Sequence, residues 1–222
     1  ENGYFYVSYY DRSIGLDNAV FCGGSTDNYY HIYQYDPLGW VTSIGEGGET
    51  AYFANVFTAQ SDEQIAAVGF YTPSTNSQYK VTVYRNIREA PVSGSPLGTT
   101  SGTISSPGYH TITLSEPVQV SRGEKFSVMV KLTTPGYQYP VAIEYPYPGF
   151  SSKASAHSGE SYISSSGALW TDISTVYANT NVCLKVLTVR TGQSTAGNPS
   201  PIPTTAPLQV VPATTPFPTP AA

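Results

Sequence analysis

Aromatic side chains are the residues of this chain whose type and placement best suit a binding function. Eight tyrosines and tryptophans fall in or beside predicted loops: Tyr29, Tyr30, Trp40, Tyr137, Tyr139, Tyr145, Tyr147 and Trp170. A flat ring on a loop can stack on the apolar face of a sugar while its hydroxyl or ring nitrogen hydrogen-bonds outward. We take six of them as candidate ligand-binding residues: Tyr29, Tyr30, Trp40, Tyr137, Tyr139 and Trp170. The alternative is that these rings cap the ends of the domain or pack against a neighbouring one.

No catalytic residue is predicted. The chain has three histidines, and the zinc-protease, serine-hydrolase, phosphate-loop and dinucleotide-binding motifs do not occur in it. His110 lies in strand alternation, which favours a surface or hydrogen-bonded core histidine, and His31 has no acidic or cysteine partner nearby in sequence. Glu46 and Glu49 could form a glycosidase pair, but such a pair must be held rigidly. Their glycine-rich loop is a poor mount, so solvated loop charges are the better interpretation.

Metal and cysteine chemistry are also weakly indicated. Asp17, Asp27 and Asp36 lie near predicted turns and could offer oxygen ligands to calcium, but no EF-hand-like spacing supports this. We therefore predict no cofactor and no metal site. Cys22 and Cys183 are the only cysteines. They could form one disulfide, worth about 4–5 kcal/mol in the chain-entropy model, or remain two buried thiols.

The composition indicates an extracellular or cell-surface protein rich in β-structure. Charged residues make up 11% of the 222 residues, while Tyr, Gly and Pro number 19, 20 and 18. Abundant Ser and Thr in place of Lys and Glu argue against long helices. A net charge of −5 leaves no basic stripe for nucleic acid, and no apolar run approaches the ~20 residues of a membrane-spanning helix.

Hydrophobic alternation predicts an all-β fold, an antiparallel two-sheet sandwich of jelly-roll type. The clearest strand covers residues 124–132, where Phe126, Val128 and Val130 alternate with polar neighbours. Other strands are expected at 18–22, 29–35, 51–58, 64–71, 79–84, 109–114, 140–145, 162–164 and 182–189. Residues 86–106, rich in Gly and Pro, are expected to form a long irregular connection.

The two ends of the chain differ from this domain. Residues 1–10 open directly as a strand, residue 1 is Glu and the only methionine is Met129, so we expect a processed chain or a fragment. Residues 191–222 carry eight prolines interspersed with threonines, which favours an extended linker or stalk without a core. The expected organisation is 1–10 as a strand left by a cut inside a larger protein, 11–190 as the sandwich and 191–222 as the stalk.

Two stretches carry a resemblance to a known family. Glu1-Asn2-Gly3-Tyr4-Phe5, followed by Val7-Ser8-Tyr9, resembles the last strand of a papain-like cysteine peptidase. The remainder, to about residue 189, resembles the lectin-like β-sandwich module that follows such peptidases in secreted archaeal and bacterial proteins. The matching segments are Tyr9-Tyr10-Asp11 to Asn18-Ala19-Val20, Tyr33-Gln34-Tyr35-Asp36-Pro37-Leu38-Gly39-Trp40, Ala54-Asn55-Val56-Phe57, Gly108-Tyr109-His110-Thr111-Ile112, and Phe126-Ser127-Val128 to Lys131-Leu132-Thr133-Thr134-Pro135-Gly136-Tyr137.

The resemblance implies a non-catalytic module of an exported cysteine peptidase. The family's nucleophile and histidine base lie upstream of the segment that begins at Glu1, so neither maps onto this chain. Its name implies binding to glycan or cell-surface polysaccharide, and an upstream peptidase domain as intramolecular partner. A structural module that stabilises the peptidase without binding sugar is the alternative, and an independent glycosidase is a third, which would need two carboxylates on rigid strand ends facing one cleft.

Overall fold

The computed structural model describes Tyr10 and residues 28–192 of the chain. The strands belong to one compact unit, Thr26–Gly197, and every strand pairing in the described part is antiparallel. The predictions for residues 1–9, 11–27 and 193–222, including the end strand, Cys22, Asp17, Asp27 and most of the stalk, lie outside the described residues.

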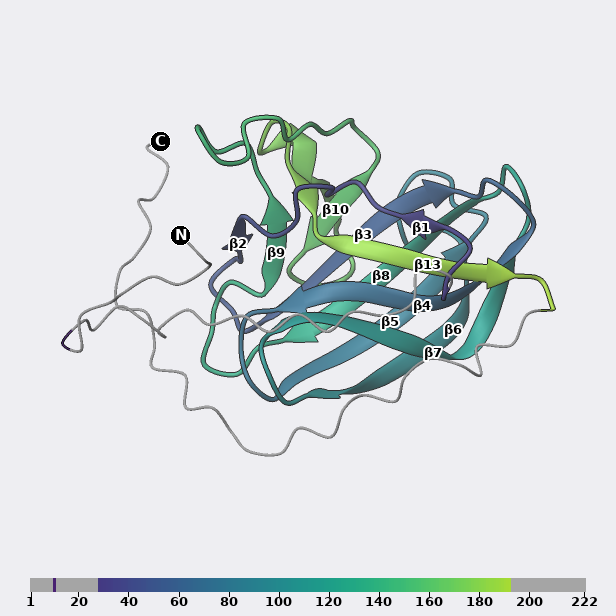
Figure 1. Cartoon of the computed structure of the whole chain (residues 1–222), viewed down its shortest axis with the longest axis horizontal. Coiled ribbons are helices and arrows are strands. Elements are labelled where there is room, and N and C mark those ends of the chain that lie inside the picture. Colours follow the sequence, from purple (N-terminus) through teal and green to yellow (C-terminus); the bar gives the residue numbers. More distant parts are fainter. Residues whose placement is uncertain (1–9, 11–27, 193–222) are drawn as a thin grey trace, which may run out of the picture. The chain divides into compact units, whose positions relative to one another are not determined.

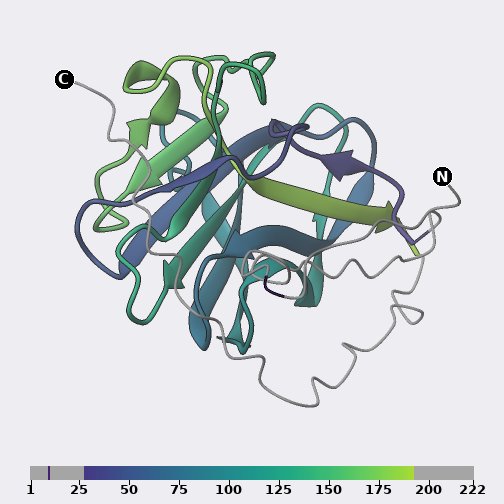
Figure 2. The same cartoon turned by 60° about the vertical axis from the view of Figure 1, so that its left-hand side comes forward.

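Two large sheets form the layers of a sandwich (Figures 1 and 2). The four-stranded sheet contains, in spatial order, β1 (Ile32–Tyr33), β13 (Leu184–Arg190), β4 (Glu63–Thr72) and β7 (Gly108–Val120). The six-stranded sheet contains β11 (Thr171–Asp172), β10 (Ser161–Ser164), β3 (Thr50–Thr58), β8 (Lys125–Thr133), β5 (Ser77–Arg85) and β6 (Ser95–Ile104). The predicted all-β sandwich is confirmed.

A third, smaller sheet was not expected. It contains β12 (Asn181–Val182), β9 (Val141–Glu144) and β2 (Thr42–Ile44), and β9 contacts both β4 and β3. The helical structure of residues 28–192 is limited to the short 3-10 turn η1 (Ile173–Thr175), and no helix there is long and apolar enough to cross a membrane.

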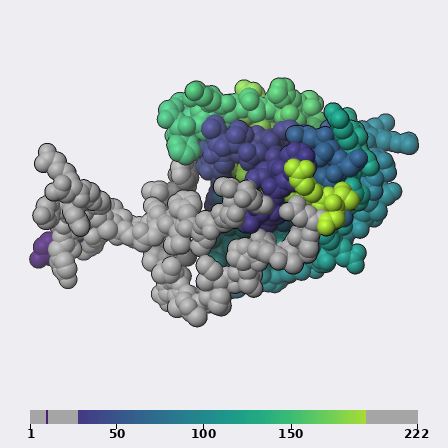
Figure 3. Space-filling model, turned by 45° about the vertical axis from the view of Figure 1, so that its right-hand side comes forward, coloured from purple at the N-terminus to yellow at the C-terminus, as the bar shows by residue number. Residues whose placement is uncertain are grey.

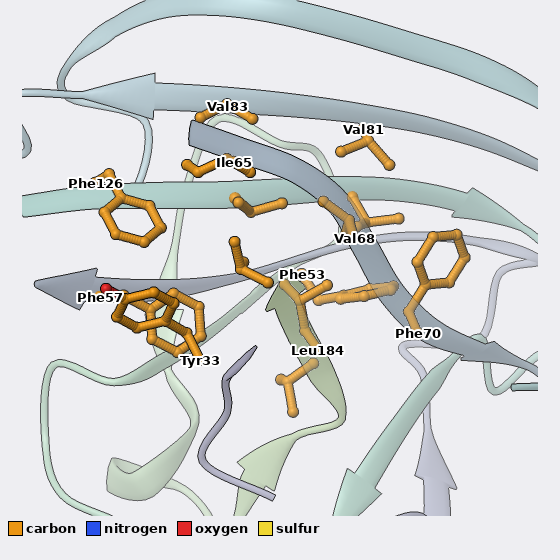
Figure 4. Close-up of a cluster of buried hydrophobic side chains, with 14 of the residues drawn as sticks. Tyr33, Phe53, Phe57, Ile65, Val68, Phe70, Val81, Val83, Phe126 and Leu184 are labelled. Carbon is orange, nitrogen blue, oxygen red and sulfur yellow. The ribbon is translucent and has the colours of Figure 1, made fainter. Parts of the chain in front are cut away.

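The core lies between the two large sheets, where the inward positions of both carry large apolar side chains (Figure 4). Phe53 of β3 and Phe70 of β4 meet across the layers with ring centroids 6.3 Å apart. Tyr33 of β1 packs edge-on against Phe126 of β8 at 5.5 Å. Burying each such ring contributes roughly 1.5–3 kcal/mol, so the alternation seen in the sequence defines the faces that hold the layers together.

The expectation of an irregular connection over residues 86–106 was wrong, because β6 occupies Ser95–Ile104 and pairs with β5. Gly98 and Gly102 lie on the less exposed side of β6. Large apolar side chains at these positions would have given the sequence an alternating hydrophobic pattern. A Cβ at Gly102 would lie 2.6 Å from the Tyr79 hydroxyl, so the tyrosine ring takes that space. When side chains of the neighbouring strand fill the space beside an edge strand, the edge strand can carry glycine there, and its sequence shows no hydrophobic alternation.

Other boundaries differ in detail. The strand expected at 29–35 is only β1, the one at 182–189 is divided into β12 and β13, and β7 continues from Gly108 to Val120. Two turns are closed by backbone hydrogen bonds: Gly39 donates its N–H to the Asp36 carbonyl, and Tyr137 donates its N–H to the Thr134 carbonyl.

Candidate binding surface

A line of aromatic rings crosses from β7 and β4 of the four-stranded sheet toward β2. Tyr109 and Tyr71 are direct cross-strand partners, with ring centroids 5.1 Å apart. Trp40, which precedes β2, follows at 5.5 Å from Tyr71. Tyr109 is 41% exposed and Trp40 36% exposed, so both can reach a ligand.

The line continues through the hydroxyl of Ser43 on β2. The Trp40 indole Nε1 donates to Ser43 Oγ at 3.0 Å. Burial raises the pKa of Tyr137, and Ser43 lies close enough to oppose this rise. Tyr137 in turn contacts Tyr139, with centroids 5.7 Å apart, and Tyr139 is 51% exposed. We call Tyr109, Tyr71, Trp40, Tyr137 and Tyr139, with Ser43 between them, the aromatic strip.

The turn that carries Trp40 is fixed by buried charges. The Lys185 ammonium of β13 bonds Asp36 Oδ2 at 2.6 Å, and the backbone N–H of Leu38 donates to Glu144 Oε1 of β9 at 2.6 Å. Gly39 adopts φ +77°, which closes the turn between them and favours glycine. Asp36, Glu144 and Lys185, which we call the Asp36 cluster, therefore fix the backbone that leads into Trp40.

Two glycines allow the strip to lie close to the backbone. A Cβ at Gly69 would lie 2.0 Å from the Tyr109 hydroxyl, so the Tyr109 ring lies directly over that position of β4. A Cβ at Gly45 would lie 2.1 Å from the Gln138 carbonyl oxygen and 2.9 Å from Tyr139 Cα. The segment with Tyr137 and Tyr139 is thus packed against the end of β2, which holds both tyrosines in place.

The six candidate residues divide into groups. Trp40, Tyr137 and Tyr139 come together in the aromatic strip. Tyr29 lies near Tyr109, at one end of the aromatic strip. Burial raises the pKa of Tyr109, and the nearby Asp36 and Tyr29 raise it further by a smaller amount.

Tyr30 and Trp170 lie elsewhere. The Tyr30 ring contacts the Arg190 guanidinium, 3.9 Å from the ring centroid, and the His31 ring, with centroids 4.0 Å apart. Trp170 belongs to the loop between β10 and β11, where its Nε1 donates to the Gly167 carbonyl at 3.2 Å. Tyr30 and Trp170 are therefore placed in other local networks.

A buried hydrogen-bond network surrounds Glu63, and sequence reasoning did not find it. His31 Nδ1 lies 2.9 Å from Glu63 Oε2, Thr188 Oγ1 donates to the same oxygen at 2.5 Å, and the Tyr33 hydroxyl donates to Oε1. The Tyr33 hydroxyl also accepts the Gln60 N–H at 2.8 Å. These contacts, which we call the Glu63 cluster, join β1, β4 and β13.

Electrostatics match this geometry. Burial favours the protonated form of Glu63, but the hydrogen bonds from Thr188, Tyr33 and His31 outweigh burial and lower its pKa. Burial and the bond to Glu63 raise the pKa of Tyr33. The carboxylate is thus held ionised inside the fold. The cluster explains how His31 is held without assigning it a catalytic step.

The remaining candidates for chemistry have structural partners. The Nε2–H of His110 donates to the Ser106 carbonyl at 2.9 Å, and burial lowers the pKa of His110. His157 lies beside Glu160 on the surface, at 3.1 Å. Glu46 is exposed, and Glu49 Oε1 accepts the Gly136 N–H at 2.9 Å. Within residues 28–192, no group of three or more His, Cys, Asp or Glu side chains is placed to hold a metal ion.

Cys183 is buried beside Asp36, and burial raises the pKa of its thiol well above the ordinary value. Cys22 lies outside the described residues, so the disulfide stays a prediction.

The strip contains three residues that the sequence interpretation missed: Ser43, Tyr71 and Tyr109. Tyr71 and Tyr109 occupy strand positions that alternate with Phe70 and His110. A bulky tyrosine on the outward side of a strand is the signal that could have found them, because such positions usually carry polar side chains.

Comparison with known proteins places the fold in a family. The sequence model of the family described as "Lectin like domain" matches residues 32–188. These residues include the aromatic strip and all but the last residues of β13. The chain belongs to the lectin-like domain family. No curated protein sequence matches it.

Two solved structures resemble this lectin-like domain. One is a variant of the clostridial cysteine protease Cwp84 after propeptide cleavage, with a TM-score of 0.60 and 25% identity over 72% of this chain and 40% of that one. The other contains the cysteine protease and lectin-like domains of Cwp84, a surface layer associated protein of Clostridium difficile. It gives a TM-score of 0.56 and 24% identity over 72% of this chain and 36% of that one. The lectin-like domain thus spans well under half of each matched protein.

Proposed function

We propose that this chain is a non-catalytic, lectin-like accessory module of an exported papain-like cysteine peptidase, and that it binds glycan or cell-surface polysaccharide through the aromatic strip. The observation that carries the proposal is the strip itself. Its rings are exposed at Trp40, Tyr109 and Tyr139, and a serine hydroxyl lies among them. Sugar recognition needs this combination, because apolar sugar faces stack on rings while hydroxyls need polar partners.

The peptidase part of the proposal rests on the family and on the sequence. One of the matched structures combines a cysteine protease with a lectin-like domain, and residues 1–10 resemble the closing strand of such a peptidase. Residues 191–222 would then act as the Thr/Pro-rich stalk. The module would work outside the cell or at its surface, next to its own peptidase domain.

The test is a glycan array and an insoluble-polysaccharide pull-down with the whole 222-residue chain, with and without calcium. We expect saturable binding to at least one glycan in these assays, and we expect it to fall roughly tenfold or more in Trp40→Ala, since central aromatic residues are the usual binding hot spots. The matched control is Trp170→Ala, which removes the other tryptophan outside the strip and should bind as the wild type does. Circular dichroism must show both variants folded. Binding that drops only in Trp170→Ala would reject the assignment of the strip.

A structural role is the second candidate, and a separate set of exposed apolar side chains favours it. Phe150 is 74% exposed, Leu169 84% and Val176 57%. They lie on the segments after β9, between β10 and β11, and after η1. Figure 3 shows the green part of the chain, which includes the segment after β9, along one side of the molecule. Apolar side chains of this size on a surface can mark a contact with another domain.

The two functions separate experimentally. In the parent protein, replacing Phe150 and Leu169 by Ser should lower the melting temperature of the peptidase domain if the module supports it. Glycan binding by the same variant should stay unchanged, because neither residue belongs to the strip. No glycan binding by the folded wild type, together with a destabilised peptidase in this variant, would replace the lectin proposal with the structural one.

A further inference from the structure

The rings of the aromatic strip are steeply inclined to one another. The planes of Trp40 and Tyr71 meet at 49°, those of Tyr71 and Tyr109 at 63°, and those of Tyr137 and Tyr139 at 70°. Neighbouring centroids are only 5.1 to 5.7 Å apart, so the faces turn sharply over short distances. The strip therefore does not form a single flat platform.

The inclination is held by contacts within the protein. Trp40 is oriented by its indole bond to Ser43 and by the turn that the Asp36 cluster fixes. Tyr109 lies over Gly69, and the segment of Tyr137 and Tyr139 is packed against Gly45. A ligand that needed coplanar rings would have to break these contacts, and the free energy for that would reduce its affinity.

Ring inclination decides which physical form of a polysaccharide can bind. The face of a crystalline polysaccharide presents many sugar rings in one plane, so it can stack on several aromatic rings only where these are coplanar. A single hydrated chain can rotate about its glycosidic bonds and offer successive sugar faces in different directions. It can therefore stack on two inclined rings without moving either of them.

We propose that the aromatic strip takes single, hydrated glycan chains or chain ends and rejects crystalline polysaccharide faces. This inference rests on the proposed function and narrows its ligand class. The contacts would come from Trp40 with Tyr71 or from Tyr137 with Tyr139, and Ser43 would offer its hydroxyl between the two pairs.

The experiment compares one polymer in two physical forms, using the whole chain. The probes are chitohexaose against crystalline chitin and cellohexaose against crystalline cellulose, with the sugars that score on the glycan array added as soluble oligosaccharides. We expect soluble chains to bind with saturation and crystalline polymers to retain no more protein than the Trp40→Ala variant does. Tyr71→Ala and Tyr139→Ala should each weaken soluble binding several-fold, and Trp170→Ala should leave it unchanged.

The outcomes distinguish this inference from the proposed function. Binding to crystalline chitin or cellulose at least as tight as to the soluble chain, and lost in Trp40→Ala, would overturn the inference and leave the lectin role standing. Absence of binding to every soluble and insoluble probe by folded protein would overturn both. Soluble binding that survives Trp40→Ala, Tyr71→Ala and Tyr139→Ala would show that the ligand lies elsewhere, and would reject the inference as well.

Discussion

Glu63 and Glu144 are both completely buried glutamates of this sandwich, yet their surroundings differ. Both oxygens of Glu63 have partners, supplied by Tyr33, His31 and Thr188. Glu144 accepts the Leu38 N–H through Oε1, while its Oε2 and Oδ1 of Asp36 are buried without a hydrogen-bond partner. The first network is complete and joins three strands. The second is incomplete and lies behind the turn that presents Trp40.

The pKa directions follow the same division. Hydrogen bonds overcome burial at Glu63 and lower its pKa, whereas burial dominates at Glu144 and raises its pKa. Burial also raises the pKa of Asp36, although Lys185 opposes it. A complete polar network stabilises a fold, and an incomplete one weakens it. In this domain the incomplete network adjoins the proposed binding surface, and functional sites are where stability is most often given up.

Removing the Glu63 carboxylate should have the largest effect on stability. Glu63→Ala leaves the Tyr33 and Thr188 hydroxyls and the His31 ring without their buried acceptor. We expect the free energy of unfolding to fall by about 3 kcal/mol at pH 7. Urea unfolding measures this, and Glu124→Ala, at a carboxylate near the surface, serves as the matched control. A loss below about 1 kcal/mol would show that the cluster does not hold β1.

The stabilities of Glu63→Gln and Glu144→Gln, each relative to wild type, should change with pH in opposite directions. Because the pKa of Glu63 is lowered by folding, its contribution is present above the ordinary pKa and is lost as the pH falls. Because folding raises the pKa of Glu144, the contribution of protonated Glu144 to the free energy of unfolding is present at low pH. It is lost as the pH rises through the raised pKa. From about pH 4 to pH 7, Glu63→Gln should therefore become less stable relative to wild type, and Glu144→Gln more stable. Urea titrations at several pH values test this, and parallel slopes would contradict it.

At neutral pH, Glu144→Gln should change the stability little. The amide oxygen of glutamine can still accept the Leu38 N–H, and the substitution removes a buried group whose ionisation burial opposes. We expect the free energy of unfolding to stay within about 1 kcal/mol of wild type, or to rise slightly. Thermal unfolding checks the prediction. A loss as large as that of Glu63→Ala would mean that the two glutamates do not differ as described.

A third carboxylate, near the surface, should have a small, salt-dependent effect. Glu124 accepts two bonds from Arg85, at 2.5 and 2.7 Å, but the Arg85 side chain is 27% exposed. Glu124→Gln should cost about 0.5–1 kcal/mol at low salt, as for a partly exposed ion pair. The difference from wild type should shrink in about 1 M NaCl, where the Debye length is about 3 Å. A difference that does not depend on salt would show that packing rather than charge holds this pair.

The strands that could be predicted are those that bury large side chains of their own. β3, β4, β5 and β8 carry alternating apolar residues, and their positions match the expectation within a residue or two. β6 could not be found, because the space at Gly102 is filled by Tyr79 from the neighbouring strand. Hydrophobic periodicity reveals a strand only when that strand buries its own apolar side chains. It gives no signal where the side chains of a partner strand fill the space instead.

The candidate site was predictable only in part for a related reason. Trp40, Tyr137 and Tyr139 stand out as aromatic residues in loops, and the pairing of β2 with β9 brings their segments together. The Glu63 cluster depends on β1 pairing with β13, and His31 and Thr188 are 157 residues apart in the chain. Nothing local in the sequence indicates that contact, since strand pairing over such a distance is decided by the whole fold.

The pairing of β1 with β13 also determines how the domain would respond to mechanical tension. Ile32 faces Leu187, and the Tyr30 N–H bonds the Thr188 carbonyl, so the described chain enters and leaves at the same end of this antiparallel pair. A force pulling residues 28 and 192 apart would separate β1 from β13 in an unzipping geometry, in which the hydrogen bonds between the two strands break one after another. The first side-chain bonds to be loaded would be those of the Glu63 cluster, which makes this corner the domain's mechanical weak point.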